Sequence, residues 1–398
     1  MFIREKYLRQ LRQYRDQAII KILIGVRRSG KSTLIEQFRT ELLHQEASPA
    51  QIQVLNFDHL QDNRLVDPHY LLQYIVDRLC KHQMNYLFLD EIELVPDFPK
   101  VVQALNTLSN TDIYLTSSNK TILTPAILDI IVPNVVIPVF PYDFAEYIKK
   151  NQQDADSENL YQYLNQGGFP FATELHGATN FRKYLSDVFN SIIMTEFVHR
   201  NTLCNPGLTS QLARQLITHA GTSQNISQIV ADLKEHRIQV SNKTVNFYLQ
   251  FLQEALLFYP CYEYDLDRHR VKPTNVKYYP VDPSLRPALI RKKNVLSQRN
   301  LENIVFLELL SRGYDVYSGQ SRGQEITFIA LKNGQLHCMQ IAFSIANDSV
   351  FQRVTSGLRQ APNKYPKTLI TVNPMINYSH DEQITVTDIY SWLTTTEV

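Results

Sequence analysis

The chain has 398 residues, a formal net charge of +1 and a sequence pI near 7.7. This length predicts about two to four domains, and the balanced charge excludes a global basic field that would hold nucleic acid nonspecifically. The four cysteines form no CxxC pair, which argues against a disulfide framework and a zinc site. The charged amino terminus lacks the apolar core of a signal peptide, and no window approaches roughly 18 uncharged apolar residues. We therefore expect a cytoplasmic protein with no membrane partner.

The first predicted elements surround a glycine-rich loop. Apolar residues at helical spacing predict a helix over residues 3–14, and the apolar run Ile22–Ile24 predicts a strand. The strand leads into Gly25-Val-Arg-Arg-Ser-Gly-Lys-Ser, the pattern of a P-loop, and a helix-forming segment follows. Glycines let backbone N–H groups turn toward a polyphosphate, and the helix directs its positive end at the same charge. The predicted nucleotide-binding residues are Gly25, Arg28, Ser29, Gly30, Lys31, Ser32 and Thr33.

Strands and helices then alternate along the chain. Strands are predicted over residues 52–57, 86–90, 112–118 and 134–140, with helices over residues 34–43, 68–81 and 98–108. Alternation of this kind predicts an α/β fold with a parallel sheet that is covered on both faces.

Two strand ends supply candidate catalytic groups. The apolar run Tyr86–Leu89 ends at Asp90 and Glu91, the Walker B pattern. There Asp90 would hold Mg²⁺ together with the Ser32 hydroxyl, and Glu91 would polarise the attacking water. The next strand ends in small polar residues, of which Ser118 or Asn119 would sense the γ-phosphate, with Asn119 as the preferred candidate. The competing interpretations are a surface carboxylate for Glu91 and a plain turn at residues 118–119.

These motifs together resemble a known family. The segments GVRRSGKSTL, LFLDE, YLTSSN, IPVFPYDFAEY, NQGGFP, KYYPVDPSL, LENIVFLELLSRGYDV and QEITFIA are similar to those of AAA-type P-loop ATPases of bacteria and archaea with a C-terminal domain of unknown function. The resemblance covers nearly the whole chain. It implies a sheet of strand order 5-1-4-3-2 and an Asp90–Glu91 pair of the subclass in which the glutamate activates water.

One departure from the family concerns hydrolysis. Before the fifth strand such proteins usually have a Gly-Arg pair, whose arginine is thought to complete a neighbour's active site, whereas this chain has Val132 and Pro133. An arginine of that kind is worth about a thousandfold or more in turnover. Two interpretations remain open: slow hydrolysis, or replacement of that arginine by Arg27 or Arg28. Nucleotide binding does not depend on it.

The middle of the chain is predicted to be helical. Apolar residues at helical spacing predict a lid over residues 156–205, near whose end Arg200 is either a phosphate-facing or a solvated arginine. Three short helices and a ribbon follow over residues 206–272, which resembles a winged helix-turn-helix. Its third helix would present Asn242, Lys243, Asn246 and Gln250, either to duplex DNA or, as in other winged helices, to a protein partner.

The last segment, residues 273–398, has a predicted order of helix, three strands, helix and strand. This order is similar to the restriction-endonuclease-like fold, which the C-terminal domain of the family resembles. Glu302 matches the helix acid of such nucleases, but Thr327 stands at the strand-acid position, and Gln340 is followed by Ala342 where a lysine is required. Without that carboxylate and lysine, metal-dependent cleavage has no machinery. We therefore expect a degenerate nuclease-like domain that binds DNA or protein or packs against the ATPase.

The sequence thus predicts four parts: an AAA-type ATPase core (1–155), a helical lid (156–205), a winged-helix module (206–272) and a degenerate nuclease-like domain (273–398). ATP and Mg²⁺ are the expected cofactors, with Mg·ATP hydrolysis driving a conformational switch. The alternatives are a nucleotide-gated scaffold that scarcely hydrolyses ATP and a DNA-binding effector. A homo-oligomer is a further expectation.

Overall fold

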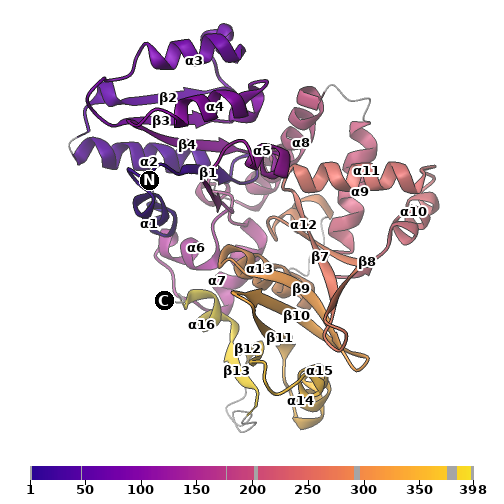
Figure 1. Ribbon diagram of the computed structural model, residues 1–398. Helices are drawn as coiled ribbons and strands as arrows, with labels where there is room; N and C mark the ends of the chain where they lie inside the picture. Colours follow the sequence, from indigo (N-terminus) through magenta and orange to yellow (C-terminus); the bar gives the residue numbers. More distant parts are fainter. Residues whose placement is uncertain are drawn as a thin grey trace. The chain divides into compact units, whose positions relative to one another are not determined.

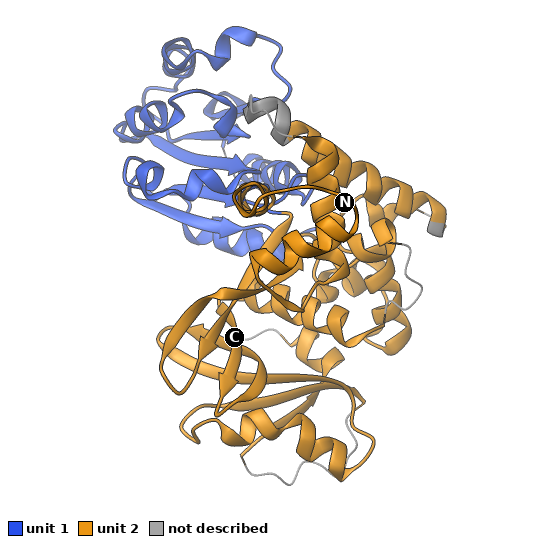
Figure 2. Cartoon of the chain, turned by 90° about the vertical axis from the view of Figure 1, so that its right-hand side faces the viewer, with its two compact units in different colours: residues 1–140, 254–256 blue, residues 141–253, 257–398 orange. Residues whose placement is uncertain are grey.

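The computed structural model describes residues 2–45, 47–175, 177–200, 205–290, 296–373 and 383–395, with the side chains of Ala178 and residues 196–200 outside the description (Figure 1). The chain divides into two compact units, which Figure 2 distinguishes by colour. Unit 1 comprises residues 1–140 and 254–256, and unit 2 comprises residues 141–253 and 257–398. Each unit is described by itself below.

Unit 1 is built on a five-stranded, fully parallel sheet of order β2-β3-β4-β1-β5. The predicted strand order is therefore confirmed. The central strands are buried along their whole length because helices cover both faces. The strands are β1 (Ile20–Ile24), β2 (Ile52–Asn56), β3 (Asn85–Asp90), β4 (Thr111–Ser117) and β5 (Asn134–Pro138).

The helices of unit 1 form a layer on each side of this sheet (Figure 1). Tyr7 of α1 and Phe38 of α2 share one cluster with Phe88 and Tyr114 of the sheet, whereas α3 and α4 pack on the opposite face. The helices are α1 (Glu5–Gln13), α2 (Lys31–His44), α3 (Pro68–Val76), α4 (Phe98–Asn106) and the short α5 (Pro125–Leu128), with 3₁₀ turns η1 (Pro49–Gln51), η2 (Asn63–Val66), η3 (Ile92–Leu94) and η4 (Lys120–Leu123).

Unit 2 begins with helices and continues into a mixed sheet. Its helices are α6 (Phe144–Asn151), α7 (Ser157–Gln166), α8 (Ala178–Arg200), α9 (Pro206–Thr218), α10 (Ile226–Glu235), α11 (Asn242–Glu254), α12 (Leu285–Ile290), α13 (Gln298–Ser311), α14 (Asp348–Val354), α15 (Ser356–Gln360) and α16 (Ile389–Thr394), with the 3₁₀ turn η5 (Ala172–Glu174). Its strands are β6 (Ser223–Gln224), β7 (Phe258–Asp265), β8 (Arg270–Pro280), β9 (Asp315–Ser321), β10 (Gln324–Lys332), β11 (Gln335–Ser344), β12 (Lys367–Asn373) and β13 (Thr385–Asp388).

The eight strands of unit 2 form one continuous sheet of order β13-β12-β11-β10-β9-β7-β8-β6. The hairpin β7–β8 of the winged-helix region joins the C-terminal strands because β7 pairs in parallel with β9. The border predicted between residues 272 and 273 thus falls inside β8, and sequence periodicity gives no sign of this long-range pairing. We also find that α6, expected within the ATPase core, packs with Phe144 and Tyr147 into the same cluster as α13.

Two apolar cores lie on opposite faces of this sheet. One contains α13 and the ring stack of Tyr279 on Phe306, whose centroids are 4.5 Å apart. The other contains Phe351 of α14 and Leu358 of α15, so the second helix predicted in this segment is divided into two. Among the helices that the structure describes, none is long and apolar enough to cross a membrane.

Candidate nucleotide site

The loop between β1 and α2 passes very close to neighbouring backbone. A Cβ on Gly25 would lie 2.0 Å from the Val139 carbonyl oxygen, so this position accepts no side chain. Gly30 has φ of 100° and caps the amino end of α2, a conformation that glycine adopts without steric cost. The first N–H groups of α2 have no partner within the helix, and they face the loop with the positive end of the helix dipole. The loop from Gly25 to Gly30 therefore has the backbone geometry that suits an anion.

The structure places the predicted loop residues in two groups. Ser29 and Lys31 are buried, while the side chains of Arg28, Ser32 and Thr33 are exposed. The Lys31 Nζ donates to the Gly25 carbonyl oxygen at 2.9 Å and lies 3.2 Å from Glu91 Oε1. The Lys31 ammonium group thus contacts both its own loop and Glu91, the candidate base.

Asp90, at the end of β3, accepts hydrogen bonds from three neighbouring elements. The Ser32 hydroxyl and the Asn56 amide each donate to its Oδ2 at 2.8 Å, and the Thr116 hydroxyl donates to its Oδ1. Burial raises the pKa of Asp90, against the opposing effect of the Thr116 and Ser32 hydrogen bonds. The Ser32 and Asp90 oxygens predicted to bind magnesium are therefore adjacent. Asn56 and Thr116 were missed by sequence reasoning, although each lies at or next to the carboxyl end of a strand.

Glu91 follows directly and has a left-handed backbone with φ of 57°. Its backbone N–H donates to the Thr116 hydroxyl, and its carboxylate accepts from the Ser118 hydroxyl and, at 3.2 Å, from the Ser118 N–H. Burial alone would raise the pKa of Glu91, but Lys31 and the Ser118 hydrogen bond outweigh it and lower the pKa. Glu91 is therefore held as a carboxylate, the state that a general base requires.

A second buried glutamate lies beside the first. Glu93 Oε1 accepts from the Ser118 N–H at 2.8 Å, and burial together with the charge of Glu91 raises the pKa of Glu93 well above its usual value. The two carboxyls thus differ in charge preference: Glu91 favours the ionised form and Glu93 the neutral one. The motif at residues 90–91 does not extend to Glu93, so sequence reasoning missed it.

Ser118 and Asn119 have different surroundings. Ser118 contacts Glu91, whereas the Asn119 side-chain oxygen caps η4 by accepting from the Thr121 N–H at 2.9 Å. The Asn119 backbone is tied to the Ser117 hydroxyl in both directions at 3.0 Å. The role expected of Asn119 in γ-phosphate sensing therefore stays a prediction, and the contact to the candidate base comes from Ser118.

The two loop arginines also differ. Arg27 forms a bidentate pair with Asp58 at 2.8 and 3.2 Å, and although burial lowers its pKa, the Asp58 hydrogen bond leaves the pKa raised. Arg28 is exposed and has φ of 67°. Val132 is 48% exposed. It is the first of the two residues that stand where the resembled family has a Gly-Arg pair. The side chain of Arg200 lies outside the described residues.

The residue directly before α1 supports the loop, whereas sequence reasoning predicted only that this helix packs on the core. Arg4 is only 3% exposed, and its Nη1 donates to the Ser29 carbonyl oxygen at 3.0 Å. Its guanidinium lies 4.4 Å from the ring centroid of Tyr7, whose hydroxyl accepts from the Phe140 N–H. Arg4 therefore holds the backbone of the loop at Ser29 through a charge-assisted hydrogen bond.

The residues present fit a magnesium nucleotide. The Ser29 hydroxyl is buried without a hydrogen-bond partner among the described residues, and the loop that contains it excludes a Cβ at Gly25. Ser32 and Asp90 supply hydroxyl and carboxylate oxygens, the ligand types that Mg²⁺ prefers. When bound, the ion would neutralise phosphate charge.

In unit 2 the predicted contact residues of α11, namely Asn242, Lys243, Asn246 and Gln250, are all exposed. Of the nuclease-like positions, Glu302, Thr327 and Ala342 are buried and Gln340 is half-buried. Glu302 accepts from Gln298 Nε2 at 2.9 Å and from the Tyr279 hydroxyl at 3.4 Å. The Thr327 N–H donates to Gln340 Oε1 at 3.1 Å, and the Thr327 hydroxyl accepts from the Ile341 N–H. The polar side chains at these positions are therefore engaged in hydrogen bonds with neighbouring residues of unit 2.

Known proteins and family models match most of the chain. A family model described as an AAA domain matches residues 17–148, and one described as a domain of unknown function (DUF8612) matches residues 157–296. An uncharacterised protein of Haemophilus influenzae is 35% identical over 377 residues, 93% of each chain. An uncharacterised protein of Methanocaldococcus jannaschii is 25% identical, over 93% of this chain and 85% of its own. Among solved structures, a Walker-type ATPase of Pyrococcus abyssi aligns with a TM-score of 0.47 and 15% identity over 73% of this chain and 96% of its own.

Proposed function

This chain belongs to the family in which an AAA domain precedes a domain of unknown function, and we propose that it binds and hydrolyses ATP in the presence of Mg²⁺. The observation that supports the proposal best is the grouping of Lys31, Ser32, Asp90 and Glu91 within hydrogen-bond and ion-pair distance at the P-loop. This grouping contains the three elements of phosphoryl transfer: a phosphate-binding ammonium, a metal-binding oxygen pair and a base.

The geometry suggests how binding couples to chemistry. Lys31 pairs with Glu91 at 3.2 Å, and a triphosphate in the loop would compete for that ammonium group. Exchange of Glu91 for phosphate oxygens on Lys31 releases one contact of the carboxylate, which is then able to polarise water. We propose that the departure of Glu91 from Lys31 begins the conformational switch expected from the sequence, while the Ser118 hydroxyl continues to hold the carboxylate.

The competing proposal is a nucleotide-gated scaffold with little hydrolysis. It is favoured by Val132 and Pro133 at the family's arginine position and by the engagement of Arg27 with Asp58. A homo-oligomer stays a prediction of the sequence, and light scattering with and without ATP tests it.

Phosphate release separates the two proposals. We expect Glu91→Gln to lower the ATP hydrolysis rate by about a hundredfold or more, the usual effect of losing a general base, while ATP binding persists in calorimetry. Glu93→Gln is the matched control: it replaces a glutamate whose raised pKa favours the neutral acid, and it should change the rate by less than about threefold. A wild-type rate no greater than that of Glu91→Gln would contradict the enzyme proposal and leave the scaffold.

We further propose a restriction-endonuclease-like fold for the C-terminal part, without nuclease activity. Helix α13 precedes the antiparallel strands β9, β10 and β11, and β12 then pairs in parallel with β11 after two helices. Thr327 and Ala342 stand where such an enzyme requires an acid and a lysine. The support for inactivity is chemical, since one buried glutamate does not make a metal site.

A further inference from the structure

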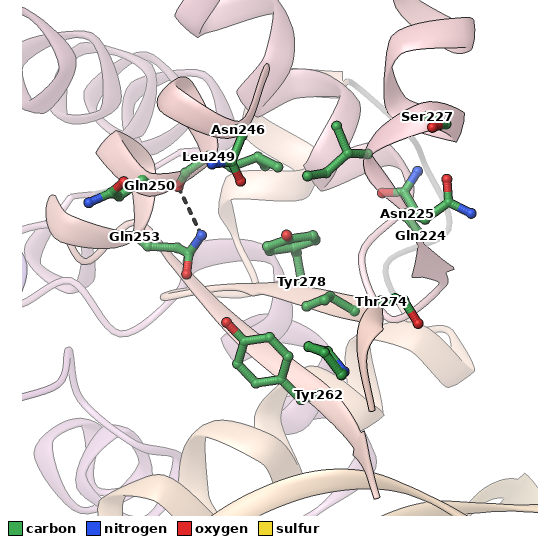
Figure 3. Close-up of a pocket in the computed structure, with 13 residues that line it drawn as sticks. Gln224, Asn225, Ser227, Asn246, Leu249, Gln250, Gln253, Tyr262, Thr274 and Tyr278 are labelled. Carbon is green, nitrogen blue, oxygen red and sulfur yellow. Dashed lines mark hydrogen bonds between the residues drawn. The ribbon is translucent and has the colours of Figure 1, made fainter. Parts of the chain in front are cut away.

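A groove in the winged-helix region is not used by the nucleotide site. It has a volume of about 520 Å³, within the range of roughly 300–1,000 Å³ typical of ligand pockets. We call it the amide groove (Figure 3). Its lining consists of Gln224, Asn225, Ile226, Ser227, Asn246, Leu249, Gln250, Gln253, Tyr262, Pro273, Thr274, Val276 and Tyr278.

Three parts of unit 2 build the amide groove. Helix α11 contributes residues at positions 246, 249, 250 and 253, the spacing of one helix face. The start of α10 and the adjoining β6 contribute the run from Gln224 to Ser227. Tyr262 of β7 and Val276 of β8 are register partners. Tyr262 and Tyr278 lie across the groove from α11 (Figure 3).

The chemistry of the lining is polar but uncharged. Five of its side chains are carboxamides, four are hydroxyl-bearing, and none is charged. Burial, with a smaller effect of Tyr262, raises the pKa of Tyr278 to about 12, so this phenol also stays neutral. A phosphate or carboxylate ligand would find no opposite charge in the groove, and burying an uncompensated charge is costly.

The amides present both donors and acceptors. The Asn225 oxygen caps α10 by accepting from the Gln228 N–H at 2.9 Å, which leaves the Asn225 NH₂ group for a ligand. The Gln253 NH₂ donates to the Leu249 carbonyl at 3.1 Å, which leaves the Gln253 oxygen. Such a pair of one N–H donor and one C=O acceptor complements a peptide unit, which has one of each.

The adjoining strand also has unpaired backbone. The register of β8 against β7 shifts, so that Val276 pairs with Tyr262 while Lys272 pairs with Glu263, and residues 273–275 lie outside the ladder. On the other side, β6 pairs only with Val276 and Lys277. Within the described strands, the backbone of residues 273–275 therefore has no strand partner, and unpaired edges of this kind accept added peptide strands.

We propose that the amide groove binds an extended, uncharged segment of a partner polypeptide, whose backbone amides pair with Asn225, Asn246, Gln250 and Gln253. Apolar side chains of the segment pack on Leu249 and Val276. Tyr262 of the lining and Phe247 of α11 are 36% and 45% accessible and supply further apolar contact. This site is separate from the nucleotide site and does not depend on ATP hydrolysis.

The test uses the full-length protein and random nonapeptides displayed on phage, from which the strongest binder is synthesised with a fluorophore. We expect the selected peptide to be uncharged in its core, and the double substitution Asn246→Ala with Gln250→Ala to weaken its binding at least tenfold in anisotropy titrations, since each hydrogen bond is worth several-fold in affinity. The control is Gln211→Ala, an exposed amide of α9 outside the groove, which should bind like the wild type.

Three results would overturn the proposal. The first is a library that yields no binder above background. The second is a selected peptide that binds the double variant as tightly as the wild type. The third is binding of a labelled oligo(dT) 20-mer or 20-bp duplex to the groove instead, with an affinity that the double substitution abolishes. Circular dichroism melting of each variant shows whether the fold is retained. The substitution Gln250→Glu, which introduces a charge without changing size, provides a second route if the double variant unfolds.

Discussion

The two units each contain a lysine close to a buried glutamate, yet the surroundings of the two clusters differ. At the P-loop, Glu91 lies just beyond a strand end and is held by Lys31 and Ser118, beside a glycine loop that excludes side chains. In unit 2, Glu302 lies within α13 and is held by Gln298 and Tyr279, while Lys277 pairs with Glu325 at 2.6 Å. We propose that these residue types serve catalysis only at the P-loop, where the first N–H groups of α2 adjoin them.

The electrostatics sharpen this contrast. The pKa of Glu91 is lowered despite burial, because Lys31 and Ser118 stabilise its charge. The pKa of Glu302 is raised by burial, although Lys277 opposes the effect. A general base has to be ionised near neutral pH. The lowered pKa of Glu91 meets this requirement, whereas the raised pKa of Glu302 favours a structural role.

The largest expected effect comes from Lys31→Ala. Removing the ammonium group deletes the main phosphate contact of the loop, and we expect ATP affinity to fall by about a hundredfold or more in calorimetric titration. Lys100→Ala, which removes an exposed lysine paired only with Asp97 on the surface, should leave ATP affinity unchanged. Equal affinity of Lys31→Ala and wild type would remove the basis of the contrast between the two clusters.

An intermediate effect is expected from Ser118→Ala. Its hydroxyl donates to Glu91, so its loss should misplace the base and lower the hydrolysis rate about tenfold. Asn119→Ala removes a cap of η4 and should chiefly cost about 1 kcal/mol of stability. If Asn119→Ala instead lowers the rate more than Ser118→Ala does, Asn119 acts as the sensor that the sequence favoured.

A smaller effect is expected from Arg4→Ala. The buried guanidinium supports the Ser29 carbonyl, and its loss should destabilise unit 1 by about 1–3 kcal/mol. Urea denaturation, followed by far-UV circular dichroism, measures this change in the free energy of unfolding. Arg9→Ala, an exposed change on α1, the helix that Arg4 precedes, serves as the control. No difference between the two variants would mean that the loop does not need this brace.

The smallest expected effect concerns the unit 2 cluster. We expect Glu302→Gln to leave the ATP hydrolysis rate unchanged, and the wild type to leave plasmid DNA intact with either Mg²⁺ or Mn²⁺, because Thr327 and Ala342 supply neither acid nor lysine. Gel electrophoresis of the plasmid is the readout. Cleavage by the wild type that Glu302→Gln abolishes would show that both clusters are catalytic.

Local sequence determined the P-loop almost completely. The glycines, Lys31 and Ser32 lie within one short turn, and the strand before it and the helix after it follow from patterns of a few residues. The order of the first sheet also followed, because the resemblance covers all five of its strands. These features depend on contacts that are close in sequence or on a motif with one known geometry.

Only the tertiary structure showed which residues converge from far along the chain. Arg4, Asn56 and Thr116 reach the site from three separate parts of the chain, and no spacing in the sequence relates them. The pairing of β7 with β9, which merges the winged-helix hairpin with the C-terminal sheet, is of the same kind. Side-chain periodicity specifies which face of a strand is buried, but not which strand lies beside it, because that choice depends on packing between distant segments.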